Sequence, residues 1–513
     1  MKQRIPVRRT ARARRTARPR RTARGRRAGP ICRPARAAAL ALLVLAASTA
    51  CTGSGGVDGT PGASGLRDPY FPKLGNGGYD VTHYDLVLDV DPGAHRLRGT
   101  ATITARATQD LSAFNLDLAG LTVRSATVEG RPAAVNRAGH ELTLRPDAGI
   151  GHRLRKGRTF RAVVRYSGSP EILTDPDRSE EGWLRTSGGA VALGEPTGAM
   201  AWFPGNNHPS DKASYDIEVT VPQGLTAVSN GELVSRTTSR AATTTGGAPD
   251  GASGGTSTYH WRVAEPMASY LATLAVGRFD TKASSTPDGI KVFTAADTAV
   301  AARSAAVLAR VPEVVAWEAE RFGPYPFSAT GAIVGRDGDA GYALETQNRP
   351  FFPGPPSVGL LVHEMAHQWF GNSVTPASWR DMWLNEGLAT YAQWLWEDDK
   401  EGEPVEDRFE AAFGNDDNWA FPPAEPPTAA DISRAPVYGR GAMVIHRIRE
   451  AVGDDERFFA LVRGWTRAHR HGTASTADFT AYVDAHVERV TGKDLTELWD
   501  TWLYGKSRPA PKD

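Results

Sequence analysis

The sequence predicts an α+β protein of more than one domain, in which a β-rich part precedes a mostly helical part. Three observations predict this class. Apolar residues alternate with polar ones from about residue 69 to 280. From about residue 290 they recur at helical spacing. The length of 513 residues is too great for one ordinary core. We therefore expect an N-terminal antiparallel β domain over residues 69–285 and a second domain over residues 286–513.

Composition excludes several classes of protein. Hydrophobic residues make up 40% and charged residues 23%, which is typical of a folded soluble chain rather than a disordered, collagen-like or polytopic membrane protein. The net charge of +2 hides an asymmetry, because residues 1–36 carry 15 basic side chains and no acid. Residues 51–513 carry 45 basic and 58 acidic side chains. A body this acidic argues against binding to nucleic acid, and we expect no such partner.

The arginine-rich N-terminus is interpreted as the start of an export signal rather than as a nucleic-acid-binding arm. An apolar run follows at residues 37–47, too short to span a bilayer as a mature helix but typical of a signal. Ser48-Thr49-Ala50-Cys51 then resembles a bacterial lipobox. We expect residues 1–50 to be removed, and Cys51 to be lipidated. The protein would be exported, as a lipoprotein facing outward from the cell membrane or as a secreted protein. The general and twin-arginine export routes both stay open.

The segments that follow are assigned from their composition and periodicity. Residues 51–68 are rich in Gly and Ser and predict a flexible tether. Apolar and polar residues alternate over 84–90, 160–166 and 215–221, with turn residues between these runs, which predicts antiparallel strands. Residues 235–258 lack large apolar side chains and predict a loop between two strands.

Helices are expected in the second domain, where apolar residues recur every three or four positions. One of them is Ala-rich and contains Pro312, near which we expect a break. The expected helices cover residues 299–322, 357–371, 384–398, 440–451 and 455–469.

A metal-binding motif lies in the second of these helices. His363 and His367 form an HExxH pattern, so both imidazoles lie on one helix face. Glu364 stands beside them, where it can take a proton from an attacking water. Glu386 follows His367 after 18 residues, on the next expected helix. Two histidines and one glutamate leave a tetrahedral position open, as catalytic zinc requires. We predict one Zn²⁺ per chain, held by these three residues; the alternative is two surface histidines and a helix-start acid.

The segment HEMAHQWFGN followed by WLNEG resembles the aminopeptidase N family of gluzincin zinc metallopeptidases. Residues 75–80, 202–213 and 265–271 also resemble family segments, so the resemblance covers about residues 69–506. It implies an N-terminal β-sandwich or saddle domain and a thermolysin-like catalytic domain. It also implies a zinc-dependent aminopeptidase that releases N-terminal residues from peptides. Larger members continue into a helical-repeat domain, so we expect a short member with a more open cleft.

The resemblance also implies roles for three further residues. The family's GAMEN motif corresponds to residues 342–346, where Glu345 is retained and implies binding of the substrate's α-ammonium. Glu195 matches a second group facing the same ammonium, so the substrates would be peptides with a free N-terminus. Residues 437–442 resemble VYEKGA, which implies that Tyr438 donates a hydrogen bond to the developing oxyanion. The alternative is two loop acids and a packing tyrosine.

Other functions stay open at this stage. The same zinc site would serve an endopeptidase or oligopeptidase, and a lipid-anchored binding protein could keep a vestigial metal site. An epoxide-opening branch of the family is a further alternative. A monomer is favoured, while the oligomeric state and the preferred first residue of the substrate stay open.

Overall fold

The structure is a computed structural model that describes residues 59–147, 154–239 and 254–510. The described residues belong to one compact unit. The predicted export signal, 1–50, and Cys51 lie outside the described residues, so their interpretation stays a prediction. In the part of the chain that the structure describes, no helix is long and apolar enough to cross a membrane.

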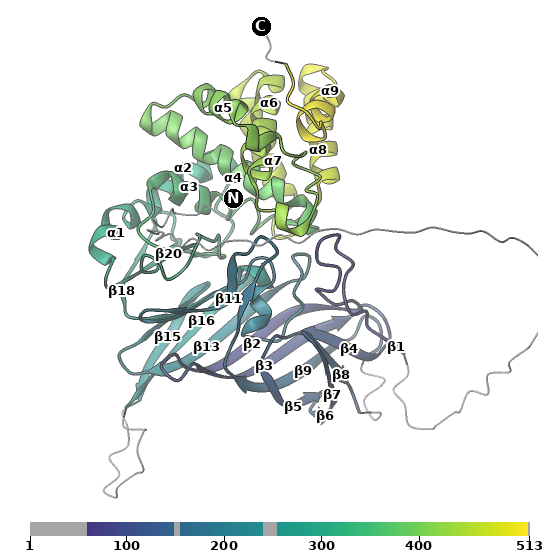
Figure 1. The fold of residues 1–513 in the computed structure, drawn as a ribbon, viewed down its shortest axis with the longest axis vertical. Coiled ribbons are helices and arrows are strands. Elements are labelled where there is room, and N and C mark those ends of the chain that lie inside the picture. The colour runs from purple at the N-terminus through teal and green to yellow at the C-terminus, as the bar shows by residue number, and fades with distance from the viewer. Residues whose placement is uncertain (1–58, 148–153, 240–253, 511–513) are drawn as a thin grey trace, which may run out of the picture. The chain divides into compact units, whose positions relative to one another are not determined.

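Strands dominate the first half of the described chain, drawn from purple to teal in Figure 1. Their bounds are β1 (Thr60–Pro61), β2 (Tyr79–Asp91), β3 (Arg96–Ala107), β4 (Leu111–Asp117), β5 (Thr122–Val128), β6 (Arg131–Pro132), β7 (Ala134–Ala138), β8 (Glu141–Arg145), β9 (Thr159–Gly168), β10 (Ile172–Thr174), β11 (Glu180–Thr186), β12 (Gly189–Leu193), β13 (Lys212–Pro222), β14 (Thr226–Ser229), β15 (Glu232–Ser239), β16 (Thr256–Ala268), β17 (Leu274–Gly277), β18 (Phe279–Ser285) and β19 (Lys291–Asp297).

The largest sheet has the strand order β15-β16-β13-β2-β3-β9-β5-β6. Its strands bury every second side chain, as the alternation predicts: Tyr84, Leu86 and Leu88 of β2 are all buried. Most pairs in this sheet are antiparallel, as predicted, but β13 runs parallel to β2 with Tyr215 opposite Tyr84. Alternation has the same period in both directions, so it does not distinguish parallel from antiparallel pairing.

The predicted tether is wrong for its described part, residues 59–68. β1 pairs with β4, and the Asn115 side chain donates to the Gly62 carbonyl at 3.2 Å. Asp68 accepts hydrogen bonds from the Ser378 hydroxyl at 2.7 Å and the Trp379 amide at 2.9 Å. Residues 59–68 therefore pack along the edge of β4 and do not form a free linker. The β-rich part therefore begins earlier than expected.

The loop predicted over residues 235–258 is shorter than expected. β15 continues to Ser239 and β16 begins at Thr256, and the two strands pair across this segment. Residues 240–253 lie outside the described residues. Exposed threonines and serines satisfy strand geometry without large apolar side chains, because this is the edge of the sheet.

Helices dominate the second half, drawn from green to yellow in Figure 1. The helices are α1 (Ala301–Leu308), α2 (Val311–Phe322), α3 (Val358–Ala366), α4 (Met382–Trp396), α5 (Val405–Gly414), α6 (Gly441–Val452), α7 (Asp455–Ala468), α8 (Thr476–Thr491) and α9 (Thr496–Leu498). The remaining strands are β20 (Ala329–Val334), β21 (Phe351–Phe352), β22 (Thr375–Pro376) and β23 (Thr473–Ala474).

The expected helices are present, with shifted ends. The break predicted near Pro312 lies at residues 309–310, and Pro312 stands in the first turn of α2, where a proline is tolerated. α5, α8 and α9 were not predicted. Ser475 and Asp478 form a capping box at the start of α8, a local signal that could have indicated it.

The two parts of the fold share a sheet and a core. β18 and β19 form a hairpin across the predicted domain boundary at residue 285, and both belong to the sheet β18-β19-β20-β21. Buried apolar side chains of the β-rich and helical parts also form one continuous cluster. The active-site side chains described below come from both parts.

Candidate metal centre and active site

The helix that carries both histidines is α3. Residues 353–356, Pro-Gly-Pro-Pro, precede it, and Ser357 caps it by accepting a hydrogen bond from the Leu360 amide at 3.1 Å. The predicted helix continued to residue 371, but α3 ends five residues earlier. Gly371 then turns the chain away with a φ of +120°, a conformation that favours glycine.

The three predicted metal ligands converge on one point. The Nε2 atoms of His363 and His367 lie 3.2 Å apart. Oε2 of Glu386 lies 3.3 Å from Nε2 of His363 and 3.5 Å from Nε2 of His367. All three side chains are buried.

This donor set fits a zinc ion. Nδ1 of His367 donates to the Phe370 carbonyl at 3.0 Å, so the lone pair of its Nε2 faces the other two ligands. Two imidazole nitrogens and one carboxylate oxygen are ligands that zinc binds, with a fourth position left open. Burial lowers the pKa of His367, but the charges of Glu345 and Glu386 outweigh it and raise that pKa. The site therefore attracts positive charge, which a metal ion supplies.

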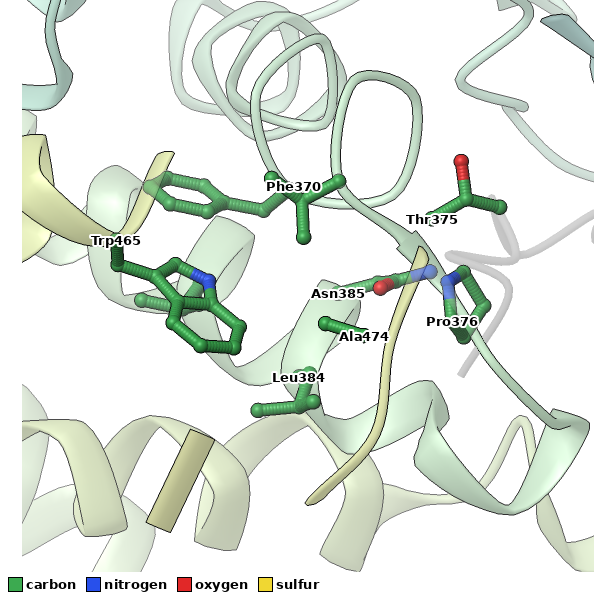
Figure 2. Close-up of a pocket in the computed structure, with 9 residues that line it drawn as sticks. Phe370, Thr375, Pro376, Leu384, Asn385, Trp465 and Ala474 are labelled. Atoms are coloured by element: carbon green, nitrogen blue, oxygen red, sulfur yellow. The ribbon is translucent and has the colours of Figure 1, made fainter. Parts of the chain in front are cut away.

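Glu386 reaches the histidines from α4 because this helix crosses α6 closely. A Cβ atom on Gly387 would lie 2.8 Å from the backbone of Gly441, so only glycine permits this crossing. Behind α4 is a small pocket where Leu384 and Asn385 meet Phe370 and the Trp465 ring (Figure 2). Leu384 lies on a different side of α4 from Glu386, so this pocket belongs to the packing that fixes the helix.

Glu364 lies beside the metal ligands in a buried position. One of its oxygens lies within 4.8 Å of ligand atoms of His367 and Glu345. Burial raises the pKa of Glu364 well above its ordinary value; the charge on His367 opposes this, and the charges of Glu345 and Glu386 add to it. A carboxyl group whose pKa is raised in this way is suited to accept and return a proton.

The two carboxylates predicted to bind an ammonium group also lie at this site. Glu345 lies in the loop between β20 and β21, and Glu195 follows β12. Both are buried, and one oxygen of each lies within 4.8 Å of the other and of a Glu386 oxygen. The structure therefore brings together residues nearly 200 positions apart in the sequence.

Tyr438 completes the predicted set. It lies in the π-helical segment η8 (Pro436–Arg440), directly before α6. Its ring is nearly parallel to that of His363, with the ring centroids 6.2 Å apart. Burial raises the pKa of Tyr438 well above its ordinary value, and the charges of Glu386 and Glu195 add to this effect. The phenol therefore stays protonated and can donate a hydrogen bond.

Sequence analysis did not identify three polar residues that position the site. The Asn372 side chain donates to the Glu345 carbonyl at 2.7 Å, and the Tyr270 hydroxyl donates to the Gly371 carbonyl at 3.2 Å. Lys212 contacts the same turn and is described further below. Asn372 closes the segment HEMAHQWFGN, and Lys212 and Tyr270 lie in the segments 202–213 and 265–271 that resemble the family. These segments were the available signals, but they did not indicate which contacts the three residues make.

The site has the ligand set of a gluzincin-type zinc metallopeptidase: two histidines of one HExxH helix and a glutamate of the next helix. The model of the peptidase family M1 domain matches residues 357–502. The chain is 27% identical to Aminopeptidase M1 of Arabidopsis thaliana over 466 residues, which is 83% of this chain and 50% of that protein. It is 26% identical to human endoplasmic reticulum aminopeptidase 1 over 345 residues, 61% of this chain and 34% of that protein.

A solved structure is also similar along most of its length. The crystal structure of a mutant M1 zinc metallopeptidase from Deinococcus radiodurans, bound to a Tyr-Ser-Ala substrate, matches with a TM-score of 0.75 and 28% identity. The match covers 87% of this chain and 99% of that chain. This chain is therefore similar to M1 zinc metallopeptidases, in sequence over residues 357–502 and in fold over most of its length. It spans half or less of the length of the curated relatives named above.

Proposed function

We propose that this protein is a zinc-dependent aminopeptidase that releases single N-terminal residues from peptides. One observation carries the proposal: carboxylate oxygens of Glu195 and Glu345 lie within 4.8 Å of an oxygen of the metal ligand Glu386. A peptide whose free ammonium group binds these two carboxylates has its first peptide bond beside the metal ligands. The similarity to the two aminopeptidases supports the same activity.

A zinc ion held at this site would supply Lewis-acid chemistry, polarising the scissile carbonyl and lowering the pKa of an attacking water. His363, His367 and Glu386 would hold the ion. Glu364 takes the proton of the attacking water and returns it to the leaving amine. Its burial and raised pKa favour the first transfer, because they stabilise the protonated carboxyl. The second transfer delivers the proton to the leaving amine, which is more basic than a carboxylate.

Tyr438 stabilises the charge that develops on the carbonyl oxygen. Its phenol remains protonated because burial and the charge of Glu386 raise its pKa. A hydrogen bond to a developing oxyanion is worth most in a buried site, where water does not compete.

The experiment that tests this function uses aminoacyl-arylamides and their N-acetylated counterparts. We expect the purified chain to release arylamine from the free substrates only. A chelator should stop the release, and added zinc should restore it. Equal cleavage of acetylated peptides would instead identify an endopeptidase, and bound zinc without turnover would identify a binding protein.

We further propose that the protein is exported and attached to the outer face of the cell membrane by a lipid on Cys51. The apolar run at 37–47 and the small residues before Cys51 support this proposal. Labelled palmitate should follow the protein in cells and should be lost in Cys51→Ala. Labelling that persists in this variant would contradict the assignment.

We also propose that the catalytic unit is a monomer. The described residues of both parts already provide the metal ligands, Glu364, Tyr438 and both ammonium-binding carboxylates. Light scattering after size exclusion should give the mass of one chain, and the mass of a dimer would contradict this.

A further inference from the structure

A buried lysine joins the β-rich part to the turn that follows the metal-binding helix. Lys212 is the first residue of β13, and its ammonium group donates three hydrogen bonds to backbone carbonyls. The acceptors are Asn372 and Ser373, each at 2.9 Å, and Gly472 at 3.2 Å. In the part of the chain that the structure describes, no carboxylate forms an ion pair with this ammonium.

Burying this ammonium opposes stability. Burial lowers the pKa of Lys212 to about 7, because the charged form loses its hydration. A charge buried without an ion pair is costly, and its three carbonyl partners offset only part of that cost. Apolar side chains can fill such an interface at lower cost, so a further role is the better explanation for a lysine here.

The turn held by Lys212 is connected to both halves of the active site. The amide of Asn372 donates to the His367 carbonyl at 3.0 Å, and the amide of Ser373 donates to the Gln368 carbonyl at 3.1 Å. The Asn372 side chain donates to the Glu345 carbonyl at 2.7 Å. A shift of this turn would therefore move the backbone that carries Glu345.

The other end of the Glu345 loop is attached to the β-rich part by a second buried cation. The Arg349 guanidinium donates to the carbonyls of Ser229 and Gly231, the latter at 2.7 Å, and to the Phe293 carbonyl at 3.1 Å. Contacts that start from the β-rich part thus hold the loop from two sides.

We propose that Lys212 is a positioning residue for substrate recognition, which holds Glu345 through Asn372 in the place where that carboxylate binds the substrate's ammonium group. The inference rests on the proposed aminopeptidase function. Lys212 does not touch the substrate; it acts through the turn at Asn372 and Ser373. The β-rich part therefore contributes to the selection of free N-termini without contacting the reacting bond.

The test compares Lys212→Met with the wild-type full chain, both loaded with zinc. Calorimetry measures the Kd values of L-tryptophan and N-acetyl-L-tryptophan, which differ at the ammonium group. We expect the wild type to bind free L-tryptophan at least tenfold more tightly, and the variant to lose most of this preference. For aminoacyl-arylamides we expect KM to rise about tenfold, with kcat within threefold of the wild type and one zinc still bound per chain.

Arg137→Met is the matched control. Arg137 also donates to three backbone carbonyls, those of Leu118, Leu121 and Gly139, but all of these lie within the β-rich part. This variant should lose stability and keep both the binding preference and KM. A purely structural role for Lys212 predicts the same pattern for Lys212→Met, and that result would overturn the proposal.

Two further variants cover the case in which Lys212→Met does not fold. Lys212→Gln keeps amide donors for some of the carbonyls but removes the charge and shortens the reach. Asn372→Ala removes the bond to Glu345 while leaving the carbonyl partners of Lys212 in place. Lys212→Gln and Asn372→Ala should each weaken the preference for the free ammonium. The double variant that combines them should lose no more of this preference than the more affected single variant. An unchanged preference in Asn372→Ala would contradict the route through this residue.

The binding measurement separates this inference from the proposed function. An inactive wild-type chain that still prefers free L-tryptophan would overturn the aminopeptidase proposal alone. An active wild-type chain whose preference survives in Lys212→Met would overturn the role of Lys212 alone.

Discussion

The proposed metal ligands and the carboxylates proposed to bind the substrate's ammonium group lie side by side, but they are held in different ways. His363, His367 and Glu386 lie on two helices close in sequence, and the packing of α3, α4 and α6 fixes them. Glu345 lies in a loop, and Glu195 comes from the β-rich part. Hydrogen bonds between residues more than 100 positions apart hold the loop.

This difference explains why the HExxH motif is present in full, whereas the GAMEN motif is only partly retained. Helical geometry demands particular residue types at particular spacings, so HExxH and the later glutamate are present in full. The Glu345 loop is fixed by contacts to distant residues. The Gln347 carbonyl accepts from the Asn230 side chain at 2.7 Å, and the Arg349 guanidinium donates to the Gly231 carbonyl at 2.7 Å. Such contacts impose no local spacing on the residues next to Glu345. Of the GAMEN motif, the alanine and the glutamate remain.

The largest expected effect lies on the metal-binding side. Glu364→Gln removes the proton acceptor while keeping the size of the side chain. We expect kcat to fall about 10³-fold, because a positioned acid–base group typically contributes 10²–10⁴-fold. Zinc analysis should still give one ion per chain, since Glu364 is not among the three predicted ligands. Loss of zinc in this variant would place Glu364 among the ligands and contradict the assignment.

Tyr438→Phe tests the tyrosine whose ring lies parallel to that of His363 in the same site. Removing one hydrogen bond to a developing oxyanion should lower kcat about 10²-fold, with KM nearly unchanged. Steady-state kinetics on one arylamide substrate would measure both constants. An increase confined to KM would instead assign Tyr438 to substrate binding.

Glu345→Gln tests the ammonium-binding side. A hydrogen bond to a charged group contributes about 2 kcal/mol, so kcat/KM for free substrates should fall about 30-fold. The effect should appear mainly in KM, unlike the effect of Glu364→Gln. If kcat falls as far as it does in that variant, the two regions do not differ in the way described above.

The smallest expected effect concerns a contact between the two parts that does not involve Glu345 or the turn at Asn372. Burial raises the pKa of Asp68, but hydrogen bonds from His208, Ser378 and the backbone amides of Tyr70 and Trp379 outweigh it and lower that pKa from 3.8 to about 2. Because the folded pKa lies below the unfolded one, ionised Asp68 stabilises the fold at pH above about 4. This contribution, about 2 kcal/mol, is lost as the pH falls towards 2.

Asp68→Asn should therefore lower the free energy of unfolding near pH 6 by about that amount, and by much less near pH 2. Denaturant unfolding at the two pH values would measure the difference. KM should stay unchanged in this variant. A change in KM would show that the loss of any contact between the two parts disturbs the site. This change would then not be specific to the contacts that hold the Glu345 loop.

The sequence predicted what depends on local geometry. One helix face carries His363 and His367, and a glutamate 18 residues later falls on the next helix, so spacing alone indicated the metal ligands. Glu345, Glu195 and Tyr438 were identified only through family resemblance, because their motifs have no geometry of their own. Lys212 was missed because it contacts residues about 160 positions away, and no periodicity reports such a distance.

The errors in the fold have a similar origin. The composition of residues 59–68 predicts a tether, but backbone bonds to β4 require no particular side chains. Parallel pairing of β13 with β2 was missed because alternation has no direction. In both cases the structure of the segment is determined by pairing with a strand that is distant in sequence. The composition of a segment does not identify that partner strand.

If Cys51 carries the proposed lipid, the early start of the β-rich part would limit how far this protein can act from a bilayer. Thr60 already lies in a strand, so only eight residues separate it from Cys51. A fully extended chain of this length reaches about 30 Å, roughly the thickness of a bilayer's hydrocarbon core. With the proposed lipid on Cys51, the protein would act as a peptidase of the membrane's immediate surface layer. Peptides emerging close to the cell would meet it before those dispersed in the medium.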